Sequence, residues 1–231
     1  MTDKPLFTTN HLLLQDIRPL LAPFNRLYWL IGGAGTGKST ISRALAAQPG
    51  VQRYDMDEHS FGDYARQYTP QRHPATTAWY TAENPFGWML SHSWENFAAL
   101  YSACNVETLD LFAADLSANY DPQRPLLVDG GITHPSLLAQ VLPPECIICL
   151  AIPPGEGARL WQTDPDRRVM LEMTLALPDG PAALQRFLTY DQKLHDLCIH
   201  ESRAAGILVL ERDRETPVAD LTTVIADHWQ L

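Results

Sequence analysis

A nonapeptide near the N-terminus combines the residue types that bind a phosphate chain. Residues 32–40 read GGAGTGKST and fit the pattern G-x-x-x-x-G-K-[ST], directly after the apolar run 27–31. Glycines let the backbone approach an anion, and successive N–H groups converge on it at a helix N-terminus. The alternative is a glycine-rich turn with a chance Lys-Ser pair, but Lys38 is one of only three lysines in the chain. The pattern predicts a nucleoside triphosphate site made by Gly32, Gly33, Ala34, Gly35, Thr36, Gly37, Lys38, Ser39 and Thr40.

Two residues of this loop and one further carboxylate predict a magnesium-dependent reaction at the phosphates. We expect Lys38 to bridge the β- and γ-phosphates and the Ser39 hydroxyl to hold Mg²⁺. Asp129 ends a second apolar run, 126–129, and a carboxylate in that position is the usual neighbour of the metal and its waters. Gly130 and Gly131 follow it, and we predict that they permit close approach of a substrate to the backbone.

Two further acidic residues, Asp55 and Asp57, follow the short segment 51–54. In an open parallel sheet, ligands bind beyond the carboxyl ends of the strands. Two carboxylates spaced i, i+2 on an extended segment face the same side. We predict that Asp57 accepts the proton of a substrate hydroxyl or orients it, and that Asp55 supports hydrated Mg²⁺. The alternative for Asp57 is the capping of a helix that starts at Glu58, and the two roles are compatible.

Arginines follow the apolar run 146–152, in the segment 153–180. We predict that this segment forms a lid, whose arginines neutralise the transferring phosphoryl group while the lid excludes water. Arg167 and Arg168 cannot point the same way on a helix, so at most one of them acts there, and Arg159 is a third candidate. The alternative is a solvated helix face. Two further arginines are candidates for flanking the nucleotide base, Arg212 and Arg214.

The elements that must position these residues alternate along the chain. Apolar runs predict strands at 27–31, 126–129, 146–152 and 207–210, and the mixed segment 51–55 is predicted to be a fifth strand. Helix-forming stretches lie between and around them, at 10–22, 38–48, 58–67, 88–119, 135–141, 157–176, 181–204 and 217–229. Strands that alternate with helices predict a parallel sheet with helices on both faces. We therefore expect one domain over 1–231, a three-layer α/β/α P-loop NTPase fold with a five-stranded, mostly parallel sheet.

The segment 58–125 is predicted to be a helical insertion that binds the substrate accepting the phosphoryl group. It contains an expected ordered loop at 68–87 and a long helical region that is broken once. Its aromatic side chains could stack a ring, such as a nucleobase or an aromatic antibiotic, or pack the core of the insertion, and we favour packing for at least half of them. They are Trp79, Tyr80, Phe86, Trp88, Trp94, Phe97 and Tyr101.

Composition narrows the partners. The net charge of the 231 residues is −10 and no basic run occurs, so we expect no nucleic-acid partner. No apolar stretch reaches about 18 residues and residues 1–5 lack a signal-peptide core, so we predict a cytoplasmic protein without a membrane partner. The sequence leaves the oligomeric state open.

The four cysteines are predicted to be buried small hydrophobes rather than metal ligands. Cys146 and Cys149 are three apart in an expected strand and would point to opposite faces, which disfavours chelation of one ion. Cys104 and Cys198 stand alone in the sequence. The histidines show no metal-ligand spacing such as H-E-x-x-H.

Together, the loop 32–40, the segment 54–57, residues 129–131 and the arginine-bearing lid resemble the P-loop small-molecule kinases of the nucleoside and nucleotide kinase-like group. The nearest types are shikimate kinase and gluconate kinase. In shikimate kinases a D-x-D after the second strand holds Mg²⁺ and the acceptor hydroxyl, and a glycine-rich strand end lies under the acceptor. The matching residues here are Asp55, Asp57, Gly130 and Gly131.

The resemblance covers the sheet and its loops, roughly two thirds of the chain. It implies an ATP- and Mg²⁺-dependent phosphotransferase that transfers the γ-phosphate to a hydroxyl of a small molecule. The 71 residues between Asp57 and Asp129 exceed what a compact shikimate kinase needs, so shikimate is not carried over as the substrate. The absence of an N-K-x-D motif argues against a GTPase.

Three alternatives stay open: a zeta-toxin-like kinase of nucleotide sugars, a non-kinase ATPase, and an ATP-binding regulatory module. An ATPase needs a positioned water, whereas a kinase needs an acceptor cavity. The role of Asp57 discriminates between the ATPase and the kinase.

Overall fold

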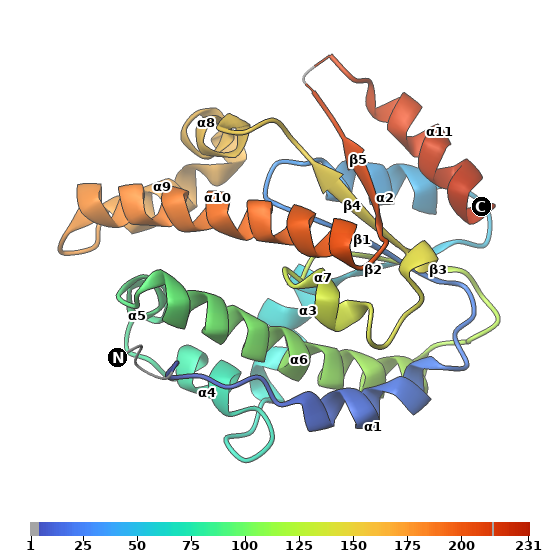
Figure 1. Ribbon diagram of the computed structural model, residues 1–231, viewed down its shortest axis with the longest axis horizontal. Helices are drawn as coiled ribbons and strands as arrows, with labels where there is room; N and C mark the ends of the chain where they lie inside the picture. Colours follow the sequence, from blue (N-terminus) through green and yellow to red (C-terminus); the bar gives the residue numbers. More distant parts are fainter. Residues whose placement is uncertain (1–4, 214) are drawn as a thin grey trace.

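The chain forms an α/β fold around a five-stranded sheet (Figure 1). The computed structural model describes residues 5–213 and 215–231. All four strand pairs are parallel, in the order β2-β3-β1-β4-β5. The sheet is therefore wholly parallel, where the sequence predicted a mostly parallel one. Its strands are β1 (Leu27–Gly32), β2 (Gln52–Asp55), β3 (Leu126–Asp129), β4 (Ile147–Ala151) and β5 (Leu208–Glu211).

The helices belong to two faces of this sheet and to a segment that extends beyond it (Figure 1). They are α1 (His11–Leu21), α2 (Lys38–Ala46), α3 (Met56–Phe61), α4 (Pro74–Tyr80), α5 (Pro85–Leu90), α6 (Trp94–Asn119), α7 (Pro135–Leu138), α8 (Glu156–Thr163), α9 (Arg168–Leu175), α10 (Gly180–Ala204) and α11 (Val218–Trp229). Three 3₁₀ turns join them, at Asp63–Arg66, Pro144–Cys146 and Pro165–Arg167.

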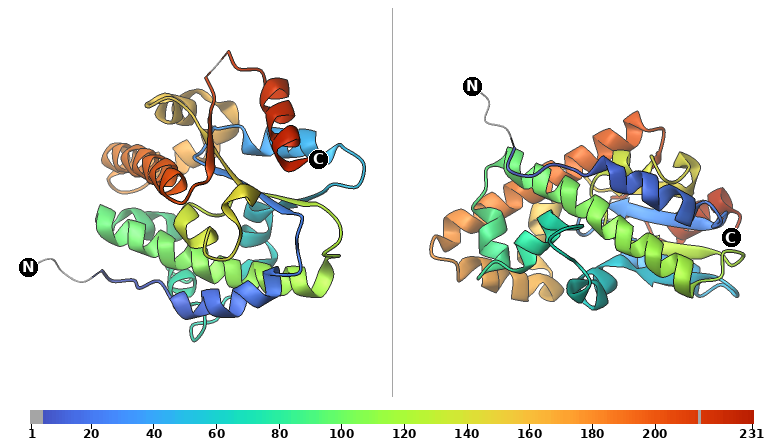
Figure 2. Two further views of the ribbon diagram at one scale, coloured as in Figure 1. Left: turned by 45° about the vertical axis from the view of Figure 1, so that its right-hand side comes forward. Right: turned by 90° about the horizontal axis from the view of Figure 1, so that it is seen from below.

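The alternation of side chains along the strands divides the core into two halves. Trp29 and Ile31 of β1 point to the cluster built with α1, α6 and α7, whereas Leu30 points to the cluster built with α2 and α11. Both halves are buried, as is typical of a parallel sheet with helices on both faces. Helix α1 lies alongside α6 and away from the sheet, which Figure 2 shows from below.

Strand register brings the predicted acidic residues to one edge of the sheet. Asp55 of β2 is the register partner of Asp129 of β3, and Asp129 is in turn the partner of Leu30 of β1. Because β1 leads directly into the loop 32–40, the carboxyl ends of three adjacent strands meet beside that loop.

Several predicted boundaries differ from the structure. The expected loop 68–87 contains α4 and the start of α5, and both helices begin at a proline, Pro74 and Pro85. Proline is favoured at the first helical position, so these residues start helices here rather than indicate a loop. The predicted break in the long helical region lies at 91–93, where the Ser93 hydroxyl accepts a hydrogen bond from the Asn96 N–H and caps α6.

The long helix α6 is buried in its middle, over residues 103–113 except the half-buried Leu111, and holds other helices through polar side chains. Glu107, only 2% exposed, accepts hydrogen bonds from the backbone N–H groups of Ala75 (3.0 Å) and Thr76 (2.7 Å) and so caps α4. Asn105 accepts from the N–H groups of Thr133 and His134 before α7. The central helix thus positions α4 and α7 as well as packing against the sheet.

The aromatic side chains of the insertion form a third core cluster. Phe97 is 2% exposed, and most of the other aromatics predicted from the sequence pack around it with Tyr190 and Leu194 of α10. Tyr80 instead stacks on Tyr68, with ring centroids 5.7 Å apart. The insertion is therefore packed against α10 and shares its core with that helix.

The cysteines follow the prediction in part. Cys104, Cys149 and Cys198 are buried, but Cys146 is half-buried in a 3₁₀ turn and not in the strand. Cys198 does not stand alone in the fold, because its Sγ lies 3.8 Å from Cys149 Sγ. No helix in the described part of the chain is long and apolar enough to cross a membrane.

Candidate functional site

The predicted phosphate loop connects β1 to α2, so its backbone lies at the N-terminus of a helix. Gly37 is the N-cap of α2 and has φ of +92°, a left-handed conformation that favours glycine. The Lys38 ammonium donates hydrogen bonds to the carbonyl oxygens of Gly32 (2.8 Å) and Gly33 (3.0 Å). Burial lowers the pKa of Lys38, and nearby Asp57 partly offsets this effect. The loop therefore presents a cation enclosed by backbone groups.

Asp129 and Ser39 lie together at the start of α2, as the sequence predicted. Asp129 is 2% exposed, and its Oδ1 accepts a hydrogen bond of 3.3 Å from Ser39 Oγ. Its Oδ2 accepts from Ser42 Oγ and from both Nε (3.0 Å) and Nη2 (2.7 Å) of Arg53. Arg53 was not predicted from the sequence, although an arginine in a strand that ends in aspartate is itself a signal of a site residue.

Asp55 has a different role from the one expected. Helix α3 begins at Met56, and Asp55 is its N-cap, since Oδ1 accepts hydrogen bonds of 3.2 Å from the N–H groups of Asp57 and Glu58. Its Oδ2 accepts from Arg53 Nη2 at 2.6 Å. The cap role that we considered for Asp57 therefore belongs to Asp55, whose oxygens are both occupied by protein donors.

Asp57 lies in the first turn of α3, so the two acidic residues do not share one face of an extended segment. Its side chain reaches solvent but is surrounded by protein, and this burial raises its pKa. Lys38 acts in the opposite direction, whereas Asp55 and Asp129 raise the pKa further. Within the described residues, no side chain donates a hydrogen bond to the Asp57 carboxylate. The backbone of Gly131 hydrogen-bonds to it and lowers its pKa in part. Among Asp55, Asp57 and Asp129, only Asp57 therefore lacks a side-chain donor within the described residues.

Gly130 and Gly131 lie under α3 rather than open to a substrate. Both have positive φ, +78° and +72°. A Cβ atom at Gly131 would lie 2.6 Å from Met56 Cβ, and one at Gly130 would lie 3.3 Å from Asp57 Oδ2. The two glycines therefore allow α3 to approach β3 closely, which seats Asp57. Contact of a substrate with their backbone stays a prediction.

The adjacent lid arginines point in different directions. The Arg167 side chain is 20% exposed, its guanidinium lies 4.3 Å from the ring centroid of Trp161, and its charge is close enough to lower the pKa of Lys38. Arg168 is 78% exposed and pairs with Glu172 at 2.8 Å. Arg159 pairs with Glu156. Arg167 also has an acidic neighbour, since its Nε lies 3.6 Å from Asp164 Oδ2. Of the three arginines, only Arg167 is among the charges that lower the pKa of Lys38, whereas Arg168 lies in solvent.

Two residues that the sequence analysis did not single out as site residues face the same region. Burial raises the pKa of Asp191 on α10, with Trp161, Arg167 and His195 lowering it in part. Burial also raises the pKa of Tyr101 on α6, and Asp191 and Asp57 are among the groups that raise it further. Their sequence positions are remote from the loop, so only the packing of α6 and α10 reveals them.

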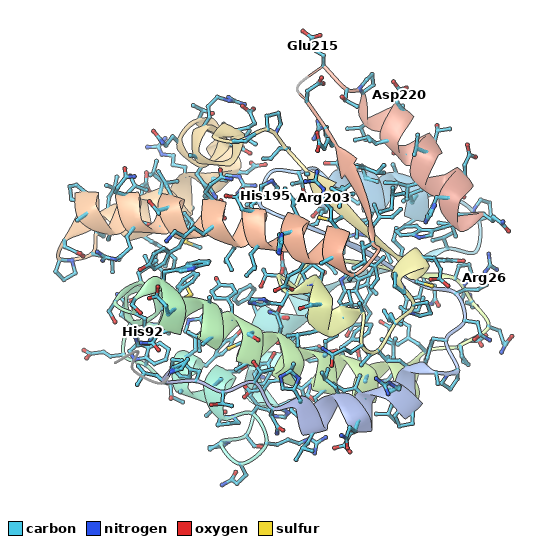
Figure 3. The ribbon with its side chains drawn as sticks, viewed as in Figure 1. Arg26, His92, His195, Arg203, Glu215 and Asp220 are labelled. Carbon is cyan, nitrogen blue, oxygen red and sulfur yellow. The ribbon has the colours of Figure 1, made fainter. Side chains whose placement is uncertain are left out.

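Two more polar side chains touch the phosphate loop. A Cβ atom at Gly33 would lie 2.4 Å from Nδ1 of His195, a residue of α10 labelled in Figure 3, and one at Gly37 would lie 2.6 Å from Arg212 Nη1. His195 Nδ1 and Arg212 Nε are buried, and within the described part of the chain neither has a hydrogen-bond partner. Arg212 thus lies beside the phosphates' expected position, whereas Arg214 falls outside the described residues.

The oxygen donors at the loop fit a magnesium ion bound together with a nucleotide. Magnesium in such sites takes one or two protein oxygens and fills its shell with phosphate oxygens and water. Ser39 Oγ and Asp129 Oδ1, 3.3 Å apart, are oxygens of this kind. Among the described residues, no group of three or more His, Cys, Asp or Glu side chains could hold a metal ion by itself.

A surface cavity of about 540 Å³ lies elsewhere, lined among others by His59, Tyr64 and Asp115, and includes none of the loop residues.

In comparisons with known proteins, no family model matches the chain and no curated protein matches it. The function of the chain must therefore be inferred from the residues of the loop and its neighbours.

Proposed function

We propose that this protein transfers the γ-phosphate of ATP to a hydroxyl group of a small molecule, with Mg²⁺ as cofactor. The observation that carries the proposal is the position of Asp57, a partly enclosed carboxylate that has no side-chain donor among the described residues and lies near the ammonium of Lys38. A phosphate loop alone fits many nucleotide-binding proteins. A free carboxylate beside the loop lysine is what a hydroxyl acceptor requires.

On the donor side, the loop backbone and Lys38 bind the triphosphate. Lys38 holds two carbonyl oxygens of the loop, and phosphate oxygens are stronger acceptors for the same ammonium group. Ser39 and Asp129 would hold Mg²⁺, which when bound neutralises charge on the β- and γ-phosphate oxygens. Arg212, whose guanidinium lies beside Gly37 at the N-cap of α2, adds a second cation beside the phosphates.

On the acceptor side, Asp57 takes the proton of the attacking hydroxyl. The hydroxyl oxygen forms a bond to the γ-phosphorus, the bond between that phosphorus and the β–γ bridging oxygen breaks, and ADP leaves with the electron pair. The raised pKa of Asp57 makes it a stronger base than an ordinary carboxylate. Arg167 stabilises the negative charge of the transferring group from the lid.

The acceptor is a neutral or cationic hydroxyl compound in this proposal. Asp57 and Asp191 place two carboxylates near Tyr101, and like charges disfavour an acidic acceptor. Trp161 and Tyr101 add aromatic surface, against which the apolar face of a sugar or ring compound can pack.

A transfer assay with ATP labelled on the γ-phosphate tests the proposal. We expect label on at least one member of a panel of nucleosides, sugars, polyol acids, aminoglycosides and nucleotide sugars. Label on a nucleotide sugar alone would identify the zeta-toxin-like activity. Hydrolysis of ATP without transfer to any member would favour the ATPase, and ATP binding without turnover would favour the regulatory module.

Two variants assign the roles. Lys38→Ala should abolish most triphosphate binding, and Asp57→Asn should bind ATP but lose transfer by about 10²–10⁴-fold. Asp63→Asn, an exposed aspartate on the turn after α3, is the matched control and should leave both unchanged. Full transfer by Asp57→Asn would remove the base from the proposal.

A further inference from the structure

Arg53 occupies a position between two carboxylates that neighbouring strands bring together. Its Nη2 lies 2.6 Å from Asp55 Oδ2 and 2.7 Å from Asp129 Oδ2, and its Nε also contacts Ser42 Oγ at 2.8 Å. Asp55 and Asp129 are register partners on β2 and β3, so the two negative charges are adjacent by construction of the sheet.

The oxygens of these two carboxylates are almost fully used. Asp55 Oδ1 caps α3 and its Oδ2 binds Arg53. Asp129 Oδ2 accepts from Ser42 and from Arg53, so only Oδ1, which accepts one long hydrogen bond from Ser39, remains for another cation.

Without Arg53 the same carboxylates would attract a hard divalent cation. Two aspartates, with the hydroxyls of Ser39 and Ser42 beside Asp129, offer oxygen ligands of the kind that Mg²⁺ and Mn²⁺ prefer. A guanidinium is always charged and forms a planar fork, so it can bridge two carboxylates permanently.

We propose that Arg53 is a built-in cation that prevents the nucleotide-free protein from binding a divalent metal, so that the metal enters only with the triphosphate. With Arg53 in place, the protein offers the metal one carboxylate oxygen and one hydroxyl, and phosphates must supply the rest of the shell. The first half of this proposal, that Arg53 keeps divalent metals out, concerns the nucleotide-free protein alone. The second half, that the metal enters with the triphosphate, rests on the proposed function.

Manganese binding without nucleotide tests the first half, because free Mn²⁺ gives an electron paramagnetic resonance signal that disappears on binding. We expect the wild-type chain to bind Mn²⁺ no tighter than about 1 mM, and Arg53→Met to bind it at least about tenfold more tightly. Adding Asp129→Asn to Arg53→Met should remove the gain. Arg43→Met, which replaces an exposed arginine of α2, is the matched control and should behave as wild type.

Removing one partner of an ion pair destabilises a fold, so the variant is also followed by thermal unfolding with and without Mn²⁺. We expect Mn²⁺ to raise the melting temperature of Arg53→Met and to leave that of the wild type unchanged. Equal Mn²⁺ affinities in the two proteins would overturn the proposal. If Arg53→Met fails to fold under either condition, the wild-type titration decides: tight binding that Asp129→Asn abolishes overturns the proposal, and its absence upholds it.

Nucleotide added to the wild type tests the second half. A non-hydrolysable ATP analogue should create a tight Mn²⁺ site, beyond the Mn²⁺ that the same analogue binds in a protein-free control. If the analogue binds and no such site forms, the coupling between metal and nucleotide is wrong. If the analogue does not bind at all, the proposed function fails, while the result on the nucleotide-free protein stands by itself.

Discussion

Asp55 and Asp57 are two residues apart, yet the helix that begins between them gives their carboxylates different chemistry. Asp55 caps α3 and pairs with Arg53. Burial would raise the pKa of Asp55, but the backbone N–H of Glu58 and the Arg53 guanidinium lower it below its ordinary value. Asp57 lacks a side-chain donor among the described residues, and burial raises its pKa. At this scale, the function of a carboxylate follows from the donors that the local backbone supplies.

The raised pKa of Asp57 predicts a pH-dependent stability. A carboxyl group whose folded pKa lies above its ordinary value of 3.8 contributes stability below that value and loses it as the pH rises through the folded pKa. Asp57→Asn removes this titration, so the variant should be more stable than wild type at pH 8 and should lose that advantage towards pH 4. Urea unfolding at several pH values measures it, with Asp63→Asn as the control. A variant less stable than wild type at pH 8 would contradict the prediction.

The different surroundings of Arg167 and Arg168 predict unequal effects of the same substitution. Arg167→Gln removes the cation near Lys38 and should lower kcat by about 10²–10³-fold, as loss of one preorganised charge does. Arg168→Gln removes an exposed side chain paired with Glu172 and should change kcat by less than about twofold. Comparable losses in the two variants would mean that the lid rearranges before the reaction.

At the scale of elements, α6 orders the insertion through side chains that a hydrophobic pattern does not predict. Glu107 and Asn105 are buried. Glu107 caps α4, which precedes α6 in the chain, and Asn105 accepts from the two N–H groups just before α7, which follows it. A helix buried on all sides carries polar groups only where each has a partner. The insertion is therefore held by defined hydrogen bonds as well as by its aromatic core.

The cap of α4 predicts a loss of stability when Glu107 is removed. Glu107→Ala leaves two buried N–H groups, those of Ala75 and Thr76, without an acceptor and should cost about 2 kcal/mol of unfolding free energy. Chemical denaturation measures this cost, and Glu95→Ala, an exposed glutamate of the same helix, is the control. Equal effects of the two substitutions would show that the cap contributes nothing.

Which elements the sequence could predict depends on whether their signal is local. All five strands lie where they were predicted, four of them from apolar runs. The pairing of β1 with β3 places Asp129 beside Ser39 of the loop. The positions of Asp191 and Tyr101 depend on how α10 and α6 pack, which periodicity does not encode. Helix α4 was missed because its Pro74 was taken as a loop signal.

At the scale of the whole molecule, the predicted lid packs directly on the phosphate loop. Helix α8 lies beyond the carboxyl end of β4 (Figure 1). Its Leu160 touches the loop so closely that a Cβ atom at Gly35 would lie 2.4 Å from Leu160 Cδ1. The lid segment continues through α9 into α10, which also carries His195 and Asp191 beside the loop. The loop and the lid therefore form one packed unit, and a change in either should be felt in the other.

Two glycines with the same backbone conformation make this coupling measurable. Gly35 and Gly50 have φ of +82° and +87°, but a Cβ atom at Gly50 would meet no atom within 4 Å. Alanine at either position should cost about 1 kcal/mol for the left-handed backbone. Gly35→Ala should cost about 1 kcal/mol more, because the new methyl group displaces Leu160.

A double-mutant cycle with Leu160→Ala separates this contact from the backbone strain. Truncating Leu160 should recover the additional loss in Gly35→Ala, giving a favourable coupling of about 1 kcal/mol, and should give no coupling with Gly50→Ala. Unfolding free energies of the six proteins measure both couplings without nucleotide. Additive effects at Gly35 would mean that α8 stands away from the loop in solution, and the position of Arg167 beside Lys38 would then require the bound triphosphate to draw the lid closed.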